Sequence, residues 1–206
     1  MLMRTADLPE RDRYKILSGT VLPRPIAWVS TIDKAGIPNL APFSFFNVAC
    51  SNPMTLMFSV GAADADKPNG KKDTLANIEA IPEFVVNLTN EETAAAMNLS
   101  ATILPHGQSE FAWAGVTPAP SLTIQAPRVA EAPVAFECTL QQIVTIGSAQ
   151  ASSSIIFGEV QGIYLRDDIY QGGYIHLDAY RPIGRLSGSG YSYVRELFEM
   201  PRVPAP

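Results

Sequence analysis

Hydrophobic and polar residues alternate in short runs through much of the chain, and β-branched and aromatic residues fill these runs. Runs of this kind, bounded by Gly, Pro, Asn and Asp, are typical of β-strands. The sequence DKAG (33–36) has the composition of a hairpin turn between the first two runs. Pro38 and Pro42 lie in the second run, which indicates an edge strand or an irregular ladder. The strands predicted in this half cover residues 24–32, 37–49, 54–60 and 83–89.

Two longer β-rich runs lie in the second half, at 133–147 and 152–165, and their short SAQA connection predicts an antiparallel pair. Before them, residues 100–132 are rich in Pro, Ser and Gly, with one helical turn expected in SEFAWAG. A segment of this length without regular structure is usually functional or packed against a partner. The tail, from residue 181 to 206, is predicted to be a loop because glycines, serines and tyrosines dominate its first part.

Helical signals fall in three places between these runs. Asp73 or Thr74 can cap the first turn of the second helix, and Pro82 ends it. Thr89 and Glu92 have the spacing of a capping box at the start of the third. The predicted helices cover about 7–19, 71–81 and 90–99.

About six strands with inserted helices, and no regular β-α-β alternation, predict a mostly β protein built on an antiparallel barrel with short helical insertions. No Gly/Ser-rich, charged or low-complexity stretch divides the chain, so we expect a single domain over 1–206. In this domain the helix at 7–19 precedes a barrel from about 24 to 180, and the tail 181–206 follows.

Composition narrows the classes of function. With 206 residues, 47% hydrophobic and 17% charged, the chain can bury a sizeable core. The formal net charge of −5, without a run of Lys or Arg, argues against a nucleic-acid partner. The N-terminus lacks the apolar core of a signal peptide, and no stretch reaches the roughly 18 apolar residues of a membrane span. We therefore expect a cytoplasmic protein with no membrane partner.

Motifs of metal, thiol and hydrolase chemistry are missing from the sequence. Cys50 and Cys138 are isolated and are predicted to be buried, inert thiols. His106 and His176 belong to no metal-binding pattern, so we interpret them as surface or locally hydrogen-bonded histidines and expect no metal site. The phosphate-binding glycine motifs and G-x-S-x-G are absent, and Ser189 in GSG is interpreted as part of a plain turn.

A group of Ser, Thr, Asn and Lys side chains lies at predicted strand ends and at a predicted helix start. Together they can supply donors for a phosphate and for the rim of a heterocycle. Ordinary strand-edge polarity with a helix cap is the alternative, and spacing alone does not decide between the two. The group consists of Ser30, Thr31, Asn39, Ser44, Lys72 and Thr74.

Five runs of sequence, in this order, resemble the flavin reductase-like family, which includes flavoredoxins and the reductase components of two-component monooxygenases. The resemblance spans about residues 24–190. It implies a Greek-key split β-barrel, a homodimer, and FMN held near the subunit interface, with FAD as a possible substitute. The runs are RPIAWVSTIDKAGIPNLAPFSFFNVACSNP, KKDTLANI, EFVVNL, SEFAWAGVTPAPS and PRVAEAPVAFEC.

The resemblance also implies positions around the flavin. The phosphate is expected near Lys72 and Thr74, where a helix N-terminus adds partial positive charge. The ring is expected beside the NLAPFS run and the strand before it, and Ser59 is a weaker candidate. The residues implied beside the ring are Ser30, Thr31, Asn39, the backbone of Ala41 and Pro42, Ser44 and Phe45.

Flavin supplies the electron sink itself, so no catalytic side chain is predicted. The implied activity is an NAD(P)H-dependent flavin reductase, in which hydride passes to flavin N5 and the reduced flavin goes to a monooxygenase or another acceptor. The alternatives are an FMN-binding electron carrier or sensor without NAD(P)H activity, and a structural dimer that has lost its cofactor.

Two further interpretations concern residues outside these runs or at their borders. Arg24 and Arg185 can contact a phosphate or a nicotinamide nucleotide, or else form surface or interface ion pairs. Phe111, Trp113 and Val116 lie in the long Pro-rich segment, which is most simply explained by packing on a second subunit. This observation independently predicts a homodimer.

Overall fold

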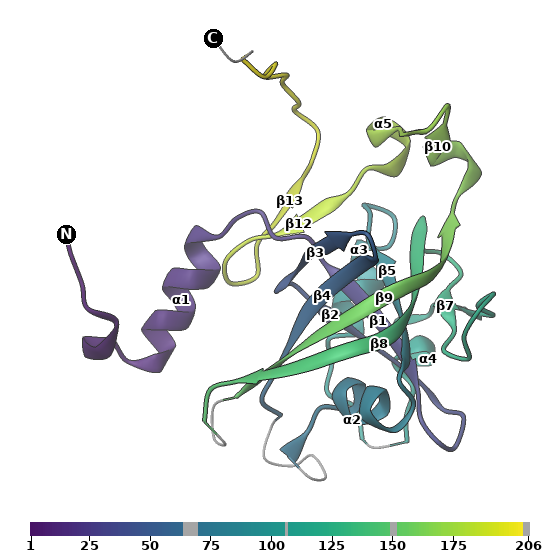
Figure 1. Cartoon of the computed structure of the whole chain (residues 1–206), viewed down its shortest axis with the longest axis horizontal. Helices are drawn as coiled ribbons and strands as arrows, with labels where there is room; N and C mark the ends of the chain where they lie inside the picture. Colours follow the sequence, from purple (N-terminus) through teal and green to yellow (C-terminus); the bar gives the residue numbers. More distant parts are fainter. Residues whose placement is uncertain (64–69, 106, 149–151, 204–206) are drawn as a thin grey trace.

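The computed structural model describes residues 1–63, 70–105, 107–148 and 152–203. Its centre is one antiparallel sheet of seven strands in the order β2-β1-β5-β8-β9-β4-β3 (Figure 1). The predicted mostly β, antiparallel fold is confirmed. The strands are β1 (Ala27–Ile32), β2 (Pro38–Phe43), β3 (Phe46–Ser51), β4 (Met54–Gly61), β5 (Glu83–Leu88), β8 (Val134–Ile146) and β9 (Ser153–Leu165).

The sheet curls into a split barrel because its two edge strands are consecutive in the chain. Only Ser44 and Phe45 separate β2 from β3, although these strands lie at opposite edges. At this corner the Ser59 amide of β4 donates a hydrogen bond to the Phe45 carbonyl at 2.8 Å. The prediction of one strand over 37–49 was therefore wrong: the run divides into β2, which pairs with β1, and β3, which pairs with β4.

Two apolar cores lie on the two faces of this sheet. Inside the barrel, Phe58 packs between Phe43 and Phe84, with ring centroids 5.2 and 5.5 Å apart, and Leu75 and Ile78 of α2 (Asp73–Ala80) contribute to the same cluster. Burial of such aromatic side chains provides much of the stability of a small domain. In the view of Figure 1, α2 lies at the lower end of the barrel.

The outer core is built from Trp28 and Leu40 of the barrel and from residues of the long Pro-rich segment, including Phe111 and Val129. This segment contains α4 (Glu110–Ala114), β6 (Pro118–Ala119) and β7 (Arg128–Val129), so the helical turn expected in SEFAWAG is present. The segment packs on its own barrel. Phe111 is 2% exposed and cannot serve a subunit contact, whereas Trp113 is 56% exposed.

The first predicted helix is α1 (Glu10–Thr20), and the third is shorter than predicted, as α3 (Ala94–Leu99). The expected capping box between Thr89 and Glu92 is not formed. Asn90 and Thr93 instead exchange hydrogen bonds, from each backbone amide to the other side chain at 3.1 Å. The Glu92 carboxylate accepts a hydrogen bond from Arg166 instead, and Thr93, the N-cap residue of α3, makes no side-chain capping hydrogen bond.

The tail is more structured than the predicted loop. It begins with a hairpin of β12 (Ile183–Arg185) and β13 (Tyr191–Tyr193), which Arg24 joins through backbone hydrogen bonds to Arg185. Because Arg24 pairs there, the first strand starts at Ala27 rather than at residue 24. Before the tail lie the small strands β10 (Tyr170–Gln171) and β11 (Tyr174–Ile175) and the helix α5 (Leu177–Tyr180).

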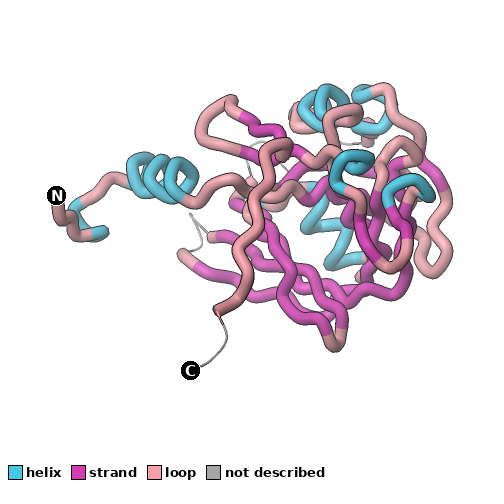
Figure 2. The backbone as a smooth tube through the Cα atoms, turned by 90° about the horizontal axis from the view of Figure 1, so that it is seen from above, coloured by secondary structure: helices cyan, strands magenta, loops and turns pink. Residues whose placement is uncertain are grey.

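The remaining expectations concern single residues and the chain ends. Cys138 is buried, and burial raises the pKa of its thiol. Cys50 is exposed on β3, so the prediction of burial was wrong for this residue. His176 lies at the surface, and His106 falls outside the described residues. The segment with α1 projects from the barrel (Figure 2), and no helix in the described ranges is both long and apolar enough to span a membrane.

Glu137 of β8 fastens the loop between β6 and β7 to the sheet. Its carboxylate is nearly buried and accepts hydrogen bonds from the Leu122 amide at 2.8 Å, the Thr123 amide at 2.7 Å and the Thr123 hydroxyl at 2.6 Å. Burial by itself raises the pKa of Glu137, but these hydrogen bonds, with Arg128 nearby, hold the pKa below its usual value. The folded protein therefore stabilises the ionised form of Glu137 more than the unfolded chain does.

We expect Glu137→Gln to lower the free energy of unfolding at pH 7 by about 1–3 kcal/mol, because two amides lose a charged acceptor. A depressed folded-state pKa contributes stability above the unfolded value, about 4.3, and loses it as the pH falls through the folded value. The difference between variant and wild type should therefore shrink below about pH 4. Urea unfolding at pH 7, 5 and 3 measures this. An equal difference at pH 7 and pH 3 would contradict the assignment.

Candidate functional site

Three neighbouring cavities meet at Pro42 and Phe43, at the end of β2 beside the barrel corner. Their volumes are about 300, 360 and 380 Å³. We call them the α2 cavity, the Tyr14 cavity and the arginine cavity, after residues that line each. Pro42 is half-buried and Phe43 buried, so this end of β2 forms a wall common to all three.

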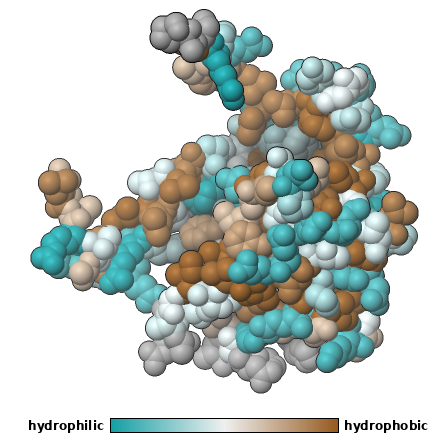
Figure 3. Space-filling view, viewed as in Figure 1, coloured by the Kyte–Doolittle hydropathy of each residue, from teal (hydrophilic) through white to brown (hydrophobic). Residues whose placement is uncertain are grey.

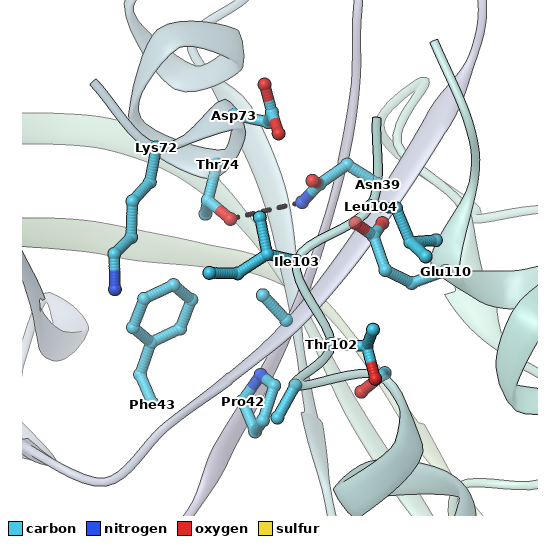
Figure 4. A pocket seen from close by; sticks show the side chains of 13 residues that line it. Asn39, Pro42, Phe43, Lys72, Asp73, Thr74, Thr102, Ile103, Leu104 and Glu110 are labelled. Atoms are coloured by element: carbon cyan, nitrogen blue, oxygen red, sulfur yellow. Dashed lines mark hydrogen bonds between the residues drawn. The ribbon is translucent and has the colours of Figure 1, made fainter. Parts of the chain in front are cut away.

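The α2 cavity lies between the start of α2, the end of β2 and residues 100–104 (Figure 4). β-strand alternation places Asn39, Ala41 and Phe43 on the same face of β2. The Asn39 amide nitrogen donates a hydrogen bond to the Thr74 hydroxyl at 3.1 Å, which ties β2 to the first turn of α2. Both side chains are buried, so this junction has a fixed geometry.

Positive charge is concentrated at the start of α2. Lys72 is the N-cap residue, and its side chain extends along the cavity toward the ring of Phe43 (Figure 4). Its side chain makes no capping hydrogen bond, and the first amides of a helix lack partners within the helix. A lysine ammonium and a helix N-terminus together favour an anion at this end of the cavity.

Two carboxylate side chains also line this cavity, one of them at the start of α2 itself. Asp73 and Glu110 both line it, and Glu110 accepts a hydrogen bond from the Leu40 amide at 3.0 Å. This bond holds α4 against β2, on which α4 also packs. Glu110 therefore shapes the wall of the cavity, while Lys72 and the first amides of α2 supply the positive charge at the α2 end, beside Asp73.

The Tyr14 cavity continues from Lys72 past the barrel corner to α1. Tyr14 of α1 stacks on Phe45, with ring centroids 6.4 Å apart, and both line this space. The hydroxyl-bearing residues Ser44 and Ser59 line it as well. Aromatic faces beside hydroxyl groups suit a flat heterocycle with a polar rim.

The arginine cavity opens on another side of the Pro42–Phe43 wall, between α1, the corner and the β12–β13 hairpin. Arg24 and Arg185 line it. The Arg24 guanidinium is 7% exposed and donates to the Ser44 hydroxyl at 3.3 Å. Neither arginine forms an ion pair with a carboxylate of the described chain, which differs from the expected surface ion pairs.

The structure brings most of the candidate residues from the sequence to these cavities. Ser30 and Thr31 lie elsewhere: the Ser30 hydroxyl donates to the Pro127 carbonyl at 2.5 Å, and the Thr31 hydroxyl accepts from Asn77 of α2 at 3.0 Å. Both are fully buried and join the barrel to neighbouring segments. Asn39, Ala41, Pro42, Lys72 and Thr74 line the α2 cavity, and Pro42, Ser44, Phe45, Ser59 and Lys72 line the Tyr14 cavity.

Other lining residues were missed by the sequence reasoning. Residues 100–104, Glu110 and Tyr14 reach the cavities from segments far from β2 in sequence. The Pro-rich composition of 100–132 indicated a functional or packed segment, but no local pattern indicated which strand it would face.

The described lining of these cavities contains charged, aromatic and hydroxyl-bearing side chains. Among the described residues no cluster of three or more His, Cys, Asp or Glu side chains is arranged to hold a metal ion. Lys72 and the first backbone amides of α2 form a cationic end that suits a phosphate. An aromatic space lined by hydroxyl groups lies beside it. An extended molecule with a phosphate at one end and a flat ring at the other suits this arrangement.

This chain is similar in sequence and in fold to known proteins. A protein of Halalkalibacterium halodurans is 38% identical over 98% of this chain and 96% of its own length. The crystal structure of nitrilotriacetate monooxygenase component B from Bacillus cereus has a TM-score of 0.91 and 34% identity, covering 97% of this chain and 98% of that one.

The structure of the 2-nitrobenzoate 2-nitroreductase NbaA of Pseudomonas fluorescens has a TM-score of 0.87 and 31% identity, covering 99% of this chain and 96% of that one. Residues 18–184 match the family described as the flavin reductase like domain. This match includes the barrel and the end of β2 that the three cavities share. The chain belongs to the flavin reductase-like family.

Proposed function

We propose that this protein binds FMN and works as an NAD(P)H-dependent flavin reductase that delivers electrons to a monooxygenase component or another acceptor. The observation that carries the proposal is the meeting of a cationic helix start and an aromatic corner at one end of β2, in a flavin reductase-like chain. The similarity to component B of a monooxygenase supports a monooxygenase as the acceptor.

The residues at the start of α2 fit the phosphate of FMN. The Lys72 ammonium and the first amides of α2 can share the charge of one phosphate, and the Thr74 hydroxyl lies in the same turn. Asn39 fixes the position of Thr74 through its hydrogen bond at 3.1 Å. FMN has a terminal phosphate where riboflavin has a hydroxyl, so this end of the site selects between the two.

The corner fits the isoalloxazine ring. Pro42 and Phe43 give an apolar wall, and Ser44, Phe45 and Ser59 line the adjoining space. Ser30 and Thr31 support the site indirectly, since their hydroxyls hold β1 to the outer segment and to α2. A bound flavin accepts hydride from NAD(P)H at N5 and passes the electrons on, so the protein needs to bind and orient rather than to supply an acid or a nucleophile.

Anaerobic titration of the flavin-loaded protein tests the proposed activity. NADH or NADPH should bleach the flavin absorbance at a rate that saturates with the nucleotide concentration. Mass analysis of the released flavin should identify FMN rather than FAD. A protein that binds FMN tightly but is bleached only by dithionite would instead be an electron carrier or sensor, and a protein that takes up no flavin would refute the proposal.

We also propose a homodimer, on different grounds from those in the sequence. Large apolar side chains are exposed on α1 and along the segment after β13, and Figure 3 shows apolar surface in both regions. They include Leu17 at 55%, Leu197 at 60% and Phe198 at 83% exposed. Exposed apolar surface on two projecting segments favours burial against another subunit.

Light scattering at micromolar concentration should return twice the chain mass of 22.2 kDa. Replacing Leu197 and Phe198 together by Asp should shift the protein toward the monomer, because two charges cannot be buried without partners. Trp113→Asp is the matched control, since Trp113 is exposed on α4 instead. A monomeric wild type refutes the proposed dimer, and a monomeric Trp113→Asp variant would move the interface to α4.

A further inference from the structure

The arginine cavity has an unusual electrostatic character. Its volume is about 380 Å³, and none of the described residues that line it is acidic. It shares Pro42 and Phe43 with the α2 and Tyr14 cavities, and Ser44 with the latter. A group bound in it would therefore lie beside, and outside, the site proposed for the flavin.

Arg24 contributes a buried positive charge to this cavity. Its guanidinium donates hydrogen bonds to the carbonyls of Ser18 at 2.7 Å, Val21 at 3.1 Å and Leu186 at 3.0 Å, and to the Ser44 hydroxyl at 3.3 Å. These bonds use four of the five N–H groups of an arginine. Every acceptor is neutral, so hydrogen bonding is largely satisfied while the charge is not balanced by a carboxylate.

Arg185 adds a second charge under similar conditions. Its guanidinium donates to the Tyr191 hydroxyl and to the Gly188 carbonyl, and it lies 4.7 Å from the centroid of the Tyr191 ring. These contacts orient the guanidinium but again leave its charge without an acidic partner in the described chain. Arg185 is half-buried, and these contacts hold its guanidinium in a fixed orientation that suits a bound anion.

In the described ranges, Arg166, Arg181 and Arg195 form ion pairs with carboxylates. Arg166 contacts Glu92 and Asp168, and Arg195 contacts Glu91 at 2.7 Å. Arg24 and Arg185 have no such carboxylate partner among the described residues, and both line the same cavity. Burying positive charge without a counter-charge costs stability, and a bound anion would offset that cost.

We propose that the arginine cavity binds the oxyanion of a second substrate, a carboxylate or a phosphate, between Arg24 and Arg185. Guanidinium groups bind both oxyanions through charge-assisted hydrogen bonds. Arg185 would donate most of them, because its contacts above use two of its five N–H groups, whereas Arg24 would contribute mainly its charge. Because the cavity adjoins the site proposed for the flavin, the oxyanion would anchor a substrate whose reacting part lies over the Pro42–Phe43 wall. The role as a substrate subsite rests on the proposed function, whereas anion binding rests on the cavity alone.

Isothermal titration of the purified protein, before and after loading with FMN, tests this at constant ionic strength with chloride as the background salt. Benzoate serves as the probe for a carboxylate and ADP as the probe for a phosphate, so the two arms distinguish the sources. We expect saturable binding of at least one probe, weakened about 10- to 150-fold in Arg185→Gln. Arg185→Lys keeps the positive charge but loses the planar guanidinium, so its affinity for the probe should lie between those of the wild type and Arg185→Gln.

Lys34→Gln removes the same charge at the exposed turn between β1 and β2 and should bind the probe like the wild type. The thermal midpoint of each variant reports whether it is folded. The proposal is overturned if neither probe saturates, or if folded Arg185→Gln and wild type bind equally. If a probe binds in an Arg185-dependent way to a protein that takes up no FMN, the anion site stands and the flavin function fails.

Discussion

Replacing Lys72 by Ala is expected to weaken FMN binding about 10- to 150-fold, the range for one charge-assisted hydrogen bond worth about 1.5 to 3 kcal/mol. Lys72 is the N-cap residue of α2 and lines both the α2 and the Tyr14 cavities. Its loss leaves the helix amides as phosphate donors, so binding should weaken without disappearing. Riboflavin, which lacks the phosphate, should bind the variant nearly as it binds the wild type.

Lys71 is the matched control for this measurement. Its ammonium contacts the Glu79 carboxylate at 2.7 Å on the exposed side of α2, so it is directed away from the cavities. Lys71→Ala should therefore change FMN affinity little. Titration of FMN and riboflavin into the wild-type, Lys71→Ala and Lys72→Ala apoproteins tests whether Lys72 binds the phosphate. The phosphate assignment is wrong if Lys72→Ala binds FMN normally or loses riboflavin to the same extent.

Replacing Asn87 by Ala is expected to lower the free energy of unfolding by about 2–5 kcal/mol. Asn87 lies fully buried on β5 and joins three parts of the chain. Its amide nitrogen donates to the Trp28 carbonyl at 2.9 Å and to the Ser30 hydroxyl at 3.1 Å, and its oxygen accepts from the Val129 amide at 2.8 Å. The variant leaves buried polar groups without these partners and a small cavity beside them.

Urea unfolding should show this loss as a lower midpoint with an unchanged slope. Asn47→Ala is the control, because Asn47 is exposed on β3, and its effect should stay within about 0.5 kcal/mol. A variant of Asn87 as stable as the wild type would show that the outer segment is held by its apolar contacts alone. Such a result would also reduce the structural role assigned to Ser30.

Lys72 and Asn87 are expected to affect the site in two different ways. Lys72 is proposed to contact the ligand directly, at the start of α2, where the N-cap residue is Lys72 itself rather than the predicted Asp73 or Thr74. Asn87 acts at a distance, by fixing the segment that passes over the outside of β1. A lower thermal stability with normal FMN affinity is the signature expected of Asn87, and the reverse is expected of Lys72.

The local pattern of residues was enough to predict the strands, the antiparallel β-class and the start of α2. These features depend on neighbours in sequence: a period of two for a strand, and cap and proline signals for a helix. The run 37–49 shows the limit of such signals. Nothing local separates β2 from β3, because their division depends on β1 and β4, which each half pairs with in the folded sheet.

The composition of the site was decided by the tertiary structure. Asn39 meets Thr74, Glu110 meets the Leu40 amide, and Arg24 pairs with Arg185 across 161 positions. Contacts between residues so far apart in sequence form only when the sheet curls and the outer segment packs on it. No periodic pattern in the sequence therefore indicates them. By itself the sequence determined the elements and most of the polar groups that line the cavities, whereas closure of the barrel determined which of them share a cavity and which only hold it together.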